Sequence, residues 1–186
     1  ARNLGASGFA DVSLRDAINN DRIPGPRLQV AGPSLGITGG HCDNNLLPKE
    51  YDAVADGVAD GPWEVRKKVR DNKKYGADVI KFCATGGVMS KGTAVGARQY
   101  TLEEMKAIVD EAHTQGMTVA AHAHGTEGIL FAIKAGVDSV EHSSLIDEEG
   151  LDLAIENGTF LSINLYTTEY VLAEGEKYGV LPESME

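Results

Sequence analysis

Gly76-Ala-Asp-Val-Ile-Lys-Phe-Cys-Ala-Thr-Gly-Gly87 is an apolar run of strand length with one lysine in its middle and a glycine turn at its end. A cation in a buried strand is costly unless it is paired, neutralised or chemically modified. Two interpretations of Lys81 follow. In the first, its ammonium group pairs with a carboxylate inside the fold. In the second, a lowered pKa makes the amine a nucleophile, a base, or a group that captures carbon dioxide and becomes a carbamate metal ligand.

Short apolar runs of this kind alternate with helical patterns along the chain. Strands are predicted over 27–31, 77–83, 117–122, 137–142 and 159–165. Helices are predicted over 8–20, 62–75, 101–116, 126–136, 147–158 and 168–178, and several of them are closed by a glycine. Thr101, Thr126 and Asp147 are the expected N-caps of three of these helices. Strands that are apolar on both faces are typical of a parallel sheet covered by helices. The sequence therefore predicts an α/β fold.

Two α/β architectures compete, a doubly wound open sheet and part of an eight-stranded (β/α)8 barrel of the TIM type. The glycine loops at Thr38-Gly-Gly40 and Thr85-Gly-Gly87 lack the spacing of a phosphate-binding loop. A nucleotide-binding open sheet is therefore poorly supported. A complete barrel normally needs about 250 residues. Residues 32–60 form a long irregular segment, which in a compact domain is usually a functional loop or a lid.

Composition limits the partners. With 28 acidic and 17 basic residues the net charge is −11, which disfavours nucleic acid and anionic membranes. No apolar run approaches the roughly 20 residues of a membrane span. We expect a cytoplasmic homo-oligomer, although Ala1–Gly5 looks like the interior of a chain and leaves an upstream signal segment open. Cys42 and Cys83 are too few for a disulfide framework, and we expect both to be small buried or half-buried thiols.

Potential metal ligands recur on successive predicted strands. Lys81 lies on one strand, and His122 and His142 end the next two. Parallel α/β folds place their chemistry at the carboxyl ends of strands, so neighbouring strands would bring the two histidines side by side. For either histidine alone a structural role is the default. Neutral imidazoles converging at one end of a sheet are a usual way to hold Zn²⁺.

Two further histidines lie close to this pattern. His124 follows His122 by two residues and faces the same side if the strand continues, so it is a third ligand, a substrate contact or a polar loop residue. His41 follows the first glycine loop and is expected at the rim of the site or in solvent.

Several ordered motifs resemble the metal-dependent amidohydrolase superfamily. The similarity is greatest to its imidazolonepropionase-like, Xaa-Pro dipeptidase-like and zinc-dependent arginine carboxypeptidase branch, and it covers essentially the whole chain. The motifs are Ile23-Pro-Gly-Pro-Arg27, Thr38-Gly-Gly-His41, Gly76-Ala-Asp-Val-Ile-Lys81, Thr85-Gly-Gly-Val-Met-Ser90, Ala120-Ala-His-Ala-His-Gly125 and Val140-Glu-His-Ser-Ser-Leu-Ile-Asp147.

The resemblance implies a distorted (β/α)8 barrel with two divalent metal ions, usually Zn²⁺. By position, Lys81 resembles the carboxylated lysine that bridges the metals, and His122 and His142 resemble ligands on the next two strands. His41 and His124 match positions near the substrate and its carboxylate. The family's His-x-His pair and its last-strand aspartate are absent. Residues 1–186 would thus be a partial barrel domain, about strands 3–7, without the first and last strands.

The implied activity is hydrolysis of an amide bond by a metal-bound hydroxide. A dipeptidase or carboxypeptidase that releases a C-terminal Arg, Lys or Pro is favoured, with a dipeptide or another small molecule as substrate. The alternatives are hydrolysis of a cyclic, imidazolone-type amide, a non-catalytic barrel homologue, and a plain α/β domain whose histidines are structural.

Overall fold

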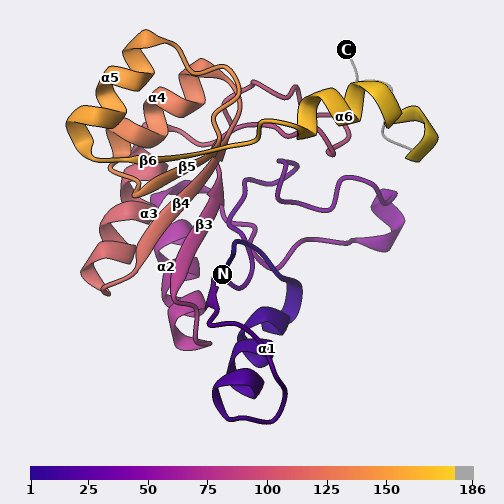
Figure 1. Ribbon diagram of the computed structural model, residues 1–186, viewed down its shortest axis with the longest axis vertical. Coiled ribbons are helices and arrows are strands. Elements are labelled where there is room, and N and C mark those ends of the chain that lie inside the picture. Colours follow the sequence, from indigo (N-terminus) through magenta and orange to yellow (C-terminus); the bar gives the residue numbers. More distant parts are fainter. Residues whose placement is uncertain (179–186) are drawn as a thin grey trace.

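The computed structural model describes residues 1–178, in which parallel strands alternate with helices (Figure 1). The strands are β1 (Arg2–Asn3), β2 (Gln29–Val30), β3 (Val79–Cys83), β4 (Thr118–Ala123), β5 (Ser139–His142) and β6 (Phe160–Ile163). The α-helices are α1 (Ala10–Asn19), α2 (Gly61–Lys74), α3 (Leu102–Thr114), α4 (Thr126–Ala135), α5 (Glu148–Asn157) and α6 (Thr167–Glu174). The predicted order of elements is confirmed. Among the strands and α-helices of residues 1–178, only β1 is additional, because two residues are too short to give a periodic signal.

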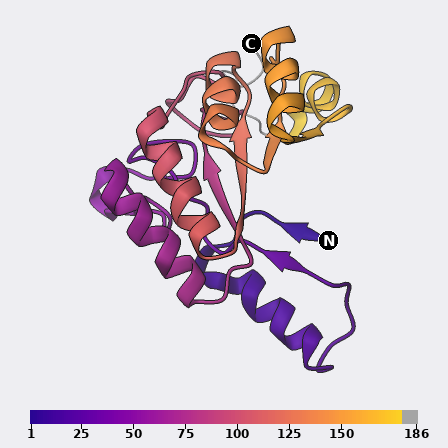
Figure 2. The same ribbon diagram turned by 90° about the vertical axis from the view of Figure 1, so that its left-hand side faces the viewer.

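The strand order distinguishes between the two architectures. β3, β4, β5 and β6 form one parallel sheet in chain order, and β1 pairs with β2, also in parallel. Helices α2 to α5 pack one against the next along one face of the larger sheet (Figures 1 and 2). A doubly wound sheet would reverse its strand order and carry helices on both faces. Strands in chain order with helices on one face are the wall of a (β/α)8 barrel, as predicted.

The chain after β2 connects the two sheets. Val30 O accepts a hydrogen bond from Asp78 N at 2.8 Å, and Leu35 N donates to Lys81 O, also at 2.8 Å. Residues 30–35 therefore run beside β3 as its neighbour in the barrel wall. The backbone of Lys81 is held on both sides, since β4 pairs with its other edge.

Side chains alternate between two different environments on this wall. Ile80, Phe82 and Val119 are fully buried on the face that packs against the helices. Lys81 lies on the opposite face, where the neighbouring side chains are small or polar. They include Cys83, Ala120, His122, Ser139 and Glu141. The polar face thus becomes the inner face of the barrel wall.

Two of the three expected helix N-caps are confirmed. The Thr101 side chain accepts from Glu104 N, and the Glu104 carboxylate accepts from Thr101 N, which completes a capping box. Asp147 caps α5 through Gly150 N. The expected cap at Thr126 is wrong. Gly125 occupies the cap position, and Thr126 Oγ1 instead donates to Leu145 O at 2.6 Å, which fixes the start of α4 to the loop after β5.

The two cysteines are joined. Cys42 and Cys83 form a disulfide with their Cα atoms 6.1 Å apart, so the expectation of two thiols is wrong. The reason is tertiary, because the long loop after β2 folds back over the carboxyl end of β3, a contact that sequence spacing does not reveal. Across residues 1–178 no helix is both long and apolar enough to cross a membrane.

Candidate metal centre

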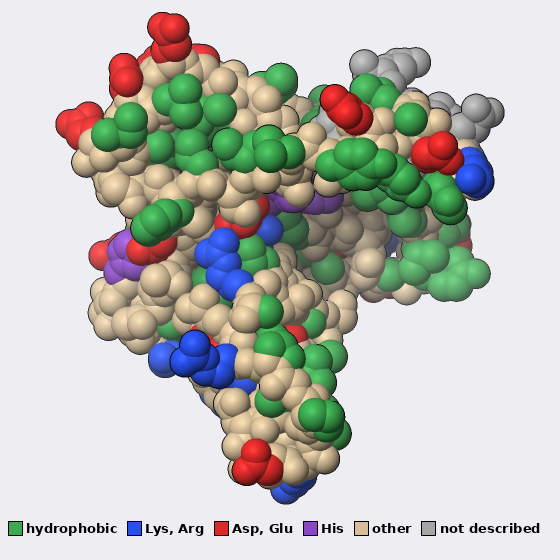
Figure 3. All heavy atoms as spheres, viewed as in Figure 1, with side chains coloured by type: hydrophobic (Ala, Val, Ile, Leu, Met, Phe, Trp, Pro, Cys, Tyr) green, Lys and Arg blue, Asp and Glu red, His purple; other side chains and the backbone are tan. Residues whose placement is uncertain are grey.

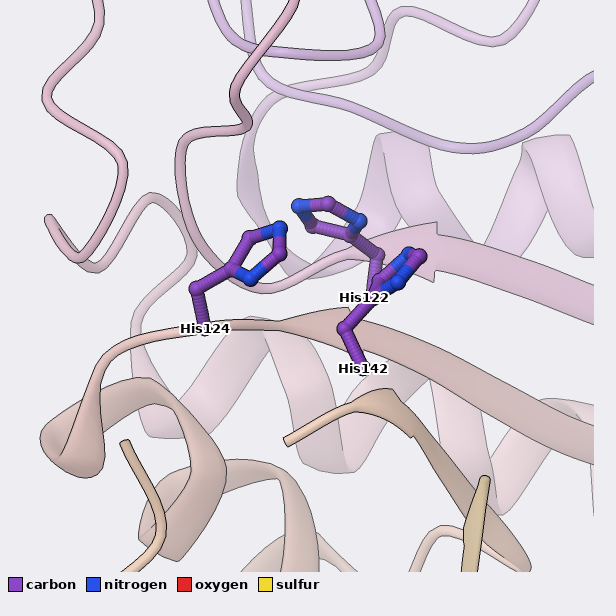
Figure 4. Close-up of side chains that lie close together, drawn as sticks. All are labelled: His122, His124 and His142. Carbon is purple, nitrogen blue, oxygen red and sulfur yellow. The ribbon is translucent and has the colours of Figure 1, made fainter. Parts of the chain in front are cut away.

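Three histidines meet at the carboxyl ends of β4 and β5. Figure 4 shows the rings of His122, His124 and His142 turned toward one another. One ligand nitrogen from each lies within 4.8 Å of the others. The ring centroids are 4.7 to 4.9 Å apart. This spacing, with His122 and His124 buried, allows the three imidazoles to face a common ion.

A local backbone feature turns His142 into this cluster. In the sheet register Glu141 pairs with His122, so strict alternation would send the next residue toward the helices. His142 instead has φ 72° and Ser143 has φ 52°, in the left-handed region that non-glycine residues rarely adopt. Such backbone conformations cost about 1–3 kcal/mol each and concentrate at functional sites. The conformation places the imidazole beside those of β4.

Hydrogen bonds fix which ring nitrogens are free. His122 Nε2 lies 3.2 Å from Gly86 O, and His142 Nδ1 lies 2.5 Å from Asn164 Oδ1. Carbonyl oxygens only accept, so both of these ring nitrogens carry the proton. The lone pairs of His122 Nδ1 and His142 Nε2 are therefore available to a metal ion. This is the usual outer support of a metal-binding histidine.

His124 has a more adaptable partner. Its Nδ1 lies 2.7 Å from Ser144 Oγ, a hydroxyl that donates or accepts. If Ser144 accepts, Nε2 has a free lone pair for a metal. If Ser144 donates, Nε2 carries a proton that can bond to a substrate oxygen. The structure places His124 within the histidine cluster, and its roles as metal ligand or substrate contact both stay predictions.

His122 and His124 are neutral at pH 7. Burial lowers the pKa of His122 to about 2, and neighbouring His41, His124 and Lys81 act in the same direction. Burial likewise lowers the pKa of His124 to about 4, with His142 and His41 adding to the effect. Neutral imidazole is the form that binds metal ions.

Lys81 lies on the same inner face and is 8% exposed. Burial lowers its pKa to about 8; Glu141 opposes this shift, and Arg2 adds to it. The Glu141 carboxylate is already bonded by Arg2 Nη2 and Ser139 Oγ at 2.7 Å each. The structural ion pair at this point therefore joins Arg2 to Glu141. Lys81 keeps about one amine in ten neutral at pH 7, which is the form that reacts with carbon dioxide.

His41 reaches the site from the long loop. Its ring centroid is 4.3 Å from that of His122. Its Nδ1 forms a short hydrogen bond with Ser90 Oγ, and its backbone N donates to Gln99 Oε1 at 3.0 Å. Burial lowers its pKa, with Lys81 and His142 contributing. His41 is therefore a fixed part of the site wall, and its contact with a substrate stays a prediction.

The histidines open into a pocket of about 330 Å³, within the usual range for small-molecule sites. Its remaining polar lining comes from Ser144, Asn164 and Thr167. These three residues were not among the predicted site residues. Ser144 is the second residue after β5 and Asn164 is the first after β6, so a search of all strand ends would have found both. No comparable signal marks Ser90, because its contact with His41 joins two loops.

The donor set fits a divalent metal ion of the zinc type. Neutral imidazoles converge, their outer nitrogens are supported, and a buried lysine lies on the same face. Fold and site together define an α/β-barrel protein with a candidate metal centre. Residues 2–182 match the Amidohydrolase family. The chain belongs to this family, whose members are generally metal-dependent.

Several known proteins are similar to this chain. Ochratoxinase of Aspergillus niger is 39% identical over 183 residues, which cover 90% of this chain and 38% of that protein. A Xaa-Pro dipeptidase whose crystal structure has methionine bound in the active site is 43% identical to this chain, with a TM-score of 0.91. The match covers 99% of this chain and 46% of the dipeptidase chain. A prolidase complexed with N-methylphosphonate-L-proline is 35% identical, with a TM-score of 0.85 and the same coverage, 99% and 46%. The chain thus spans less than half of each.

Proposed function

We propose that the complete protein is a metal-dependent hydrolase of amide bonds that acts as a dipeptidase or carboxypeptidase near a peptide C-terminus. The observation that carries this proposal is the cluster of His122, His124 and His142 on the inner face that also carries buried Lys81. Similarity to a Xaa-Pro dipeptidase, a prolidase and an ochratoxinase supports hydrolysis of an amide over a purely structural role.

Lys81 is the proposed bridging ligand in its carboxylated form. The neutral Nζ lone pair attacks the carbon of carbon dioxide, an N–C bond forms, one C=O electron pair moves to oxygen, and the amine proton leaves to solvent. The product is a carbamate anion. This reaction replaces a costly buried ammonium with an anion that two cations neutralise. We assign His122 and His142 as further ligands, with Zn²⁺ as the favoured metal.

The bound metals would supply Lewis-acid polarisation of the amide carbonyl and a water molecule of lowered pKa. The chain's own residues would hold the metal ions and orient the substrate. Gly86 and Asn164 keep His122 and His142 in the tautomers that bind metal. His124 and His41 lie at the pocket wall, where a ring N–H would bond to a carboxylate oxygen of the substrate.

Metal analysis and a substrate panel test this proposal. The complete protein should purify with divalent metal, or take it up from added zinc, and should hydrolyse some members of a dipeptide panel. The panel includes cyclic amides, so preferential opening of a ring would identify the imidazolone-type alternative. Metal binding without hydrolysis would identify a non-catalytic homologue. A protein that holds no metal and gains none from zinc would disprove the proposal.

Substitution of Lys81 separates the metal site from a plain α/β domain. Lys81→Ala should abolish binuclear metal binding and activity, and a short carboxylic acid in the buffer should partly restore both. Lys106→Ala, on the helical outer layer, is the matched control. If Lys81 and the histidines are only structural, Lys81→Ala changes the unfolding free energy and leaves metal content at the control level.

A further inference from the structure

Two apolar segments far apart in the sequence face the histidines across the pocket. Val88 and Met89 come from the loop after β3, and Val171 and Leu172 come from α6. Figure 3 shows hydrophobic side chains gathered along the underside of α6, beside a hollow in which histidine is visible. The histidine side of the pocket thus suits binding of a metal ion and a carboxylate. The side formed by the loop after β3 and by α6 suits a hydrocarbon group.

The part of the pocket lining that the structure describes offers no charged partner for a basic side chain. Among the described residues, those that line the pocket include no Asp, Glu, Lys or Arg. The acidic excess of the chain, with a net charge of −11, therefore lies elsewhere. An ammonium or guanidinium group entering this pocket would lose water without gaining a counter-ion, which is costly. The lining therefore argues against Arg or Lys as the substrate residue that this pocket holds.

The apolar wall also presents surface that a ligand would cover. Met89 is 59% exposed and Leu172 is 60% exposed, although both line the pocket. Each square ångström of apolar surface removed from water contributes about 25 cal/mol. Exposed apolar surface next to a polar cluster commonly marks a ligand-binding groove. An uncharged hydrocarbon group of the substrate would cover this wall while its amide lies over the histidines.

We infer that this pocket selects an uncharged, apolar substrate residue next to the scissile amide, held between Val88 and Met89 on one side and Val171 and Leu172 on the other. The inference rests on the proposed amide hydrolysis and narrows its substrate class. Proline, leucine, methionine and phenylalanine fit such a wall. Lysine and arginine do not.

Norleucine and lysine form a suitable pair of probes, because their side chains are similar in shape and differ in charge. In the zinc-loaded complete protein, kcat/KM for dipeptides with norleucine should exceed that for the matching lysine dipeptides by at least about 10-fold. Each residue is tested at both positions of the dipeptide. An equal or greater rate with the lysine dipeptides at both positions would overturn the inference.

One substitution should move this preference. Leu172→Asp places a carboxylate in the apolar wall, so kcat/KM should fall about 10-fold for norleucine dipeptides and rise for lysine dipeptides, with metal content unchanged. Leu165→Asp is the control, since Leu165 is 88% exposed and outside the pocket lining. If Leu172→Asp behaves like this control, the wall does not select the substrate.

A binding measurement tests the apolar preference of the pocket separately from the proposed amide hydrolysis. Calorimetric titration with free L-norleucine and L-lysine requires no hydrolysis. Tighter binding of norleucine, weakened by Leu172→Asp and not by Leu165→Asp, would support the apolar pocket even if every dipeptide were left intact. Lysine binding as tightly as norleucine would overturn the inference, whatever the rates of hydrolysis.

Discussion

The ring of His41 lies 4.3 Å from the ring of His122, although the two residues come from different parts of the chain. The residue after His41 is bonded through its sulfur to Cys83, and Cys83 is the register partner of His122 on the neighbouring strand. The loop histidine is thus attached to the strand pair that carries the candidate metal centre. The disulfide therefore holds the loop that carries His41 next to the site.

Reduction of this disulfide should destabilise the protein. It closes a loop with a sequence separation of 41 residues, and the chain-entropy relation gives about 4 kcal/mol for a loop of that size. We expect the free energy of unfolding of the complete protein, measured by urea titration, to fall by up to this amount when a reductant is added. The Cys42→Ser/Cys83→Ser variant should resemble the reduced protein and should not respond to reductant. Two thiols that titrate freely in the oxidised wild type would contradict this linkage.

The barrel wall was predictable because it depends on local patterns. Each of its features gives a sequence signal within a few residues. Examples are the helix cap at Thr101, the glycine stop at Gly136, which has φ 94°, and the apolar strands. The positions of His122 and His142 followed from one rule, that parallel strands end at the same edge. These features required no knowledge of distant contacts.

What escaped prediction depends on contacts between remote segments. The disulfide, the Ser90 contact with His41 and the apolar wall from α6 all arise where loops meet. The turn of His142 into the cluster also escaped, because alternation along β5 predicts the opposite face and only its left-handed backbone reverses this. The Arg2–Glu141 pair likewise joins the first residues to a strand far along the chain.

Removal of the Asn164 side-chain amide should weaken metal binding. Asn164 Oδ1 fixes the protonated Nδ1 of His142 and so exposes the Nε2 lone pair. Loss of such an outer partner typically costs about 10- to 100-fold in metal affinity or activity. We expect Asn164→Ala to show this loss in zinc titrations monitored by a competing chelator. Ser162→Ala, at an exposed position in β6, is the control. Equal affinities for the two variants would show that the tautomer of His142 is not set by Asn164.

The metal-free protein should become less stable as the pH falls from about 6.5 to about 4. The pKa of His124 is lowered from 6.5 to about 4 by burial. Between about pH 4 and 6.5 His124 binds a proton in the unfolded state and not in the folded state, so a falling pH favours unfolding. Above pH 6.5 His124 is neutral in both states, and its contribution to stability is constant. The full shift corresponds to at most about 3 kcal/mol.

Unfolding by urea over a pH series, with a chelator present, measures this dependence. His124→Gln should flatten the acid side of the stability curve. His113→Gln is the control, since His113 lies at the end of α3, and its side chain is 44% exposed. If both variants follow the wild-type curve, His124 is not the buried neutral group that the structure shows.

Alanine at position 87 should displace His41 without disturbing the metal ligands. A Cβ atom added to Gly87 would overlap three atoms of the His41 ring, whereas a Cβ at Gly96, in the same loop, meets its nearest neighbour at an ordinary 3.4 Å. Because His41 borders the pocket and is not part of the three-histidine cluster, Gly87→Ala should raise KM for norleucine dipeptides by about 10-fold and leave metal content unchanged. Gly96→Ala should behave as the wild type. Loss of metal in Gly87→Ala would place His41 among the ligands, and an unchanged KM would remove it from substrate binding.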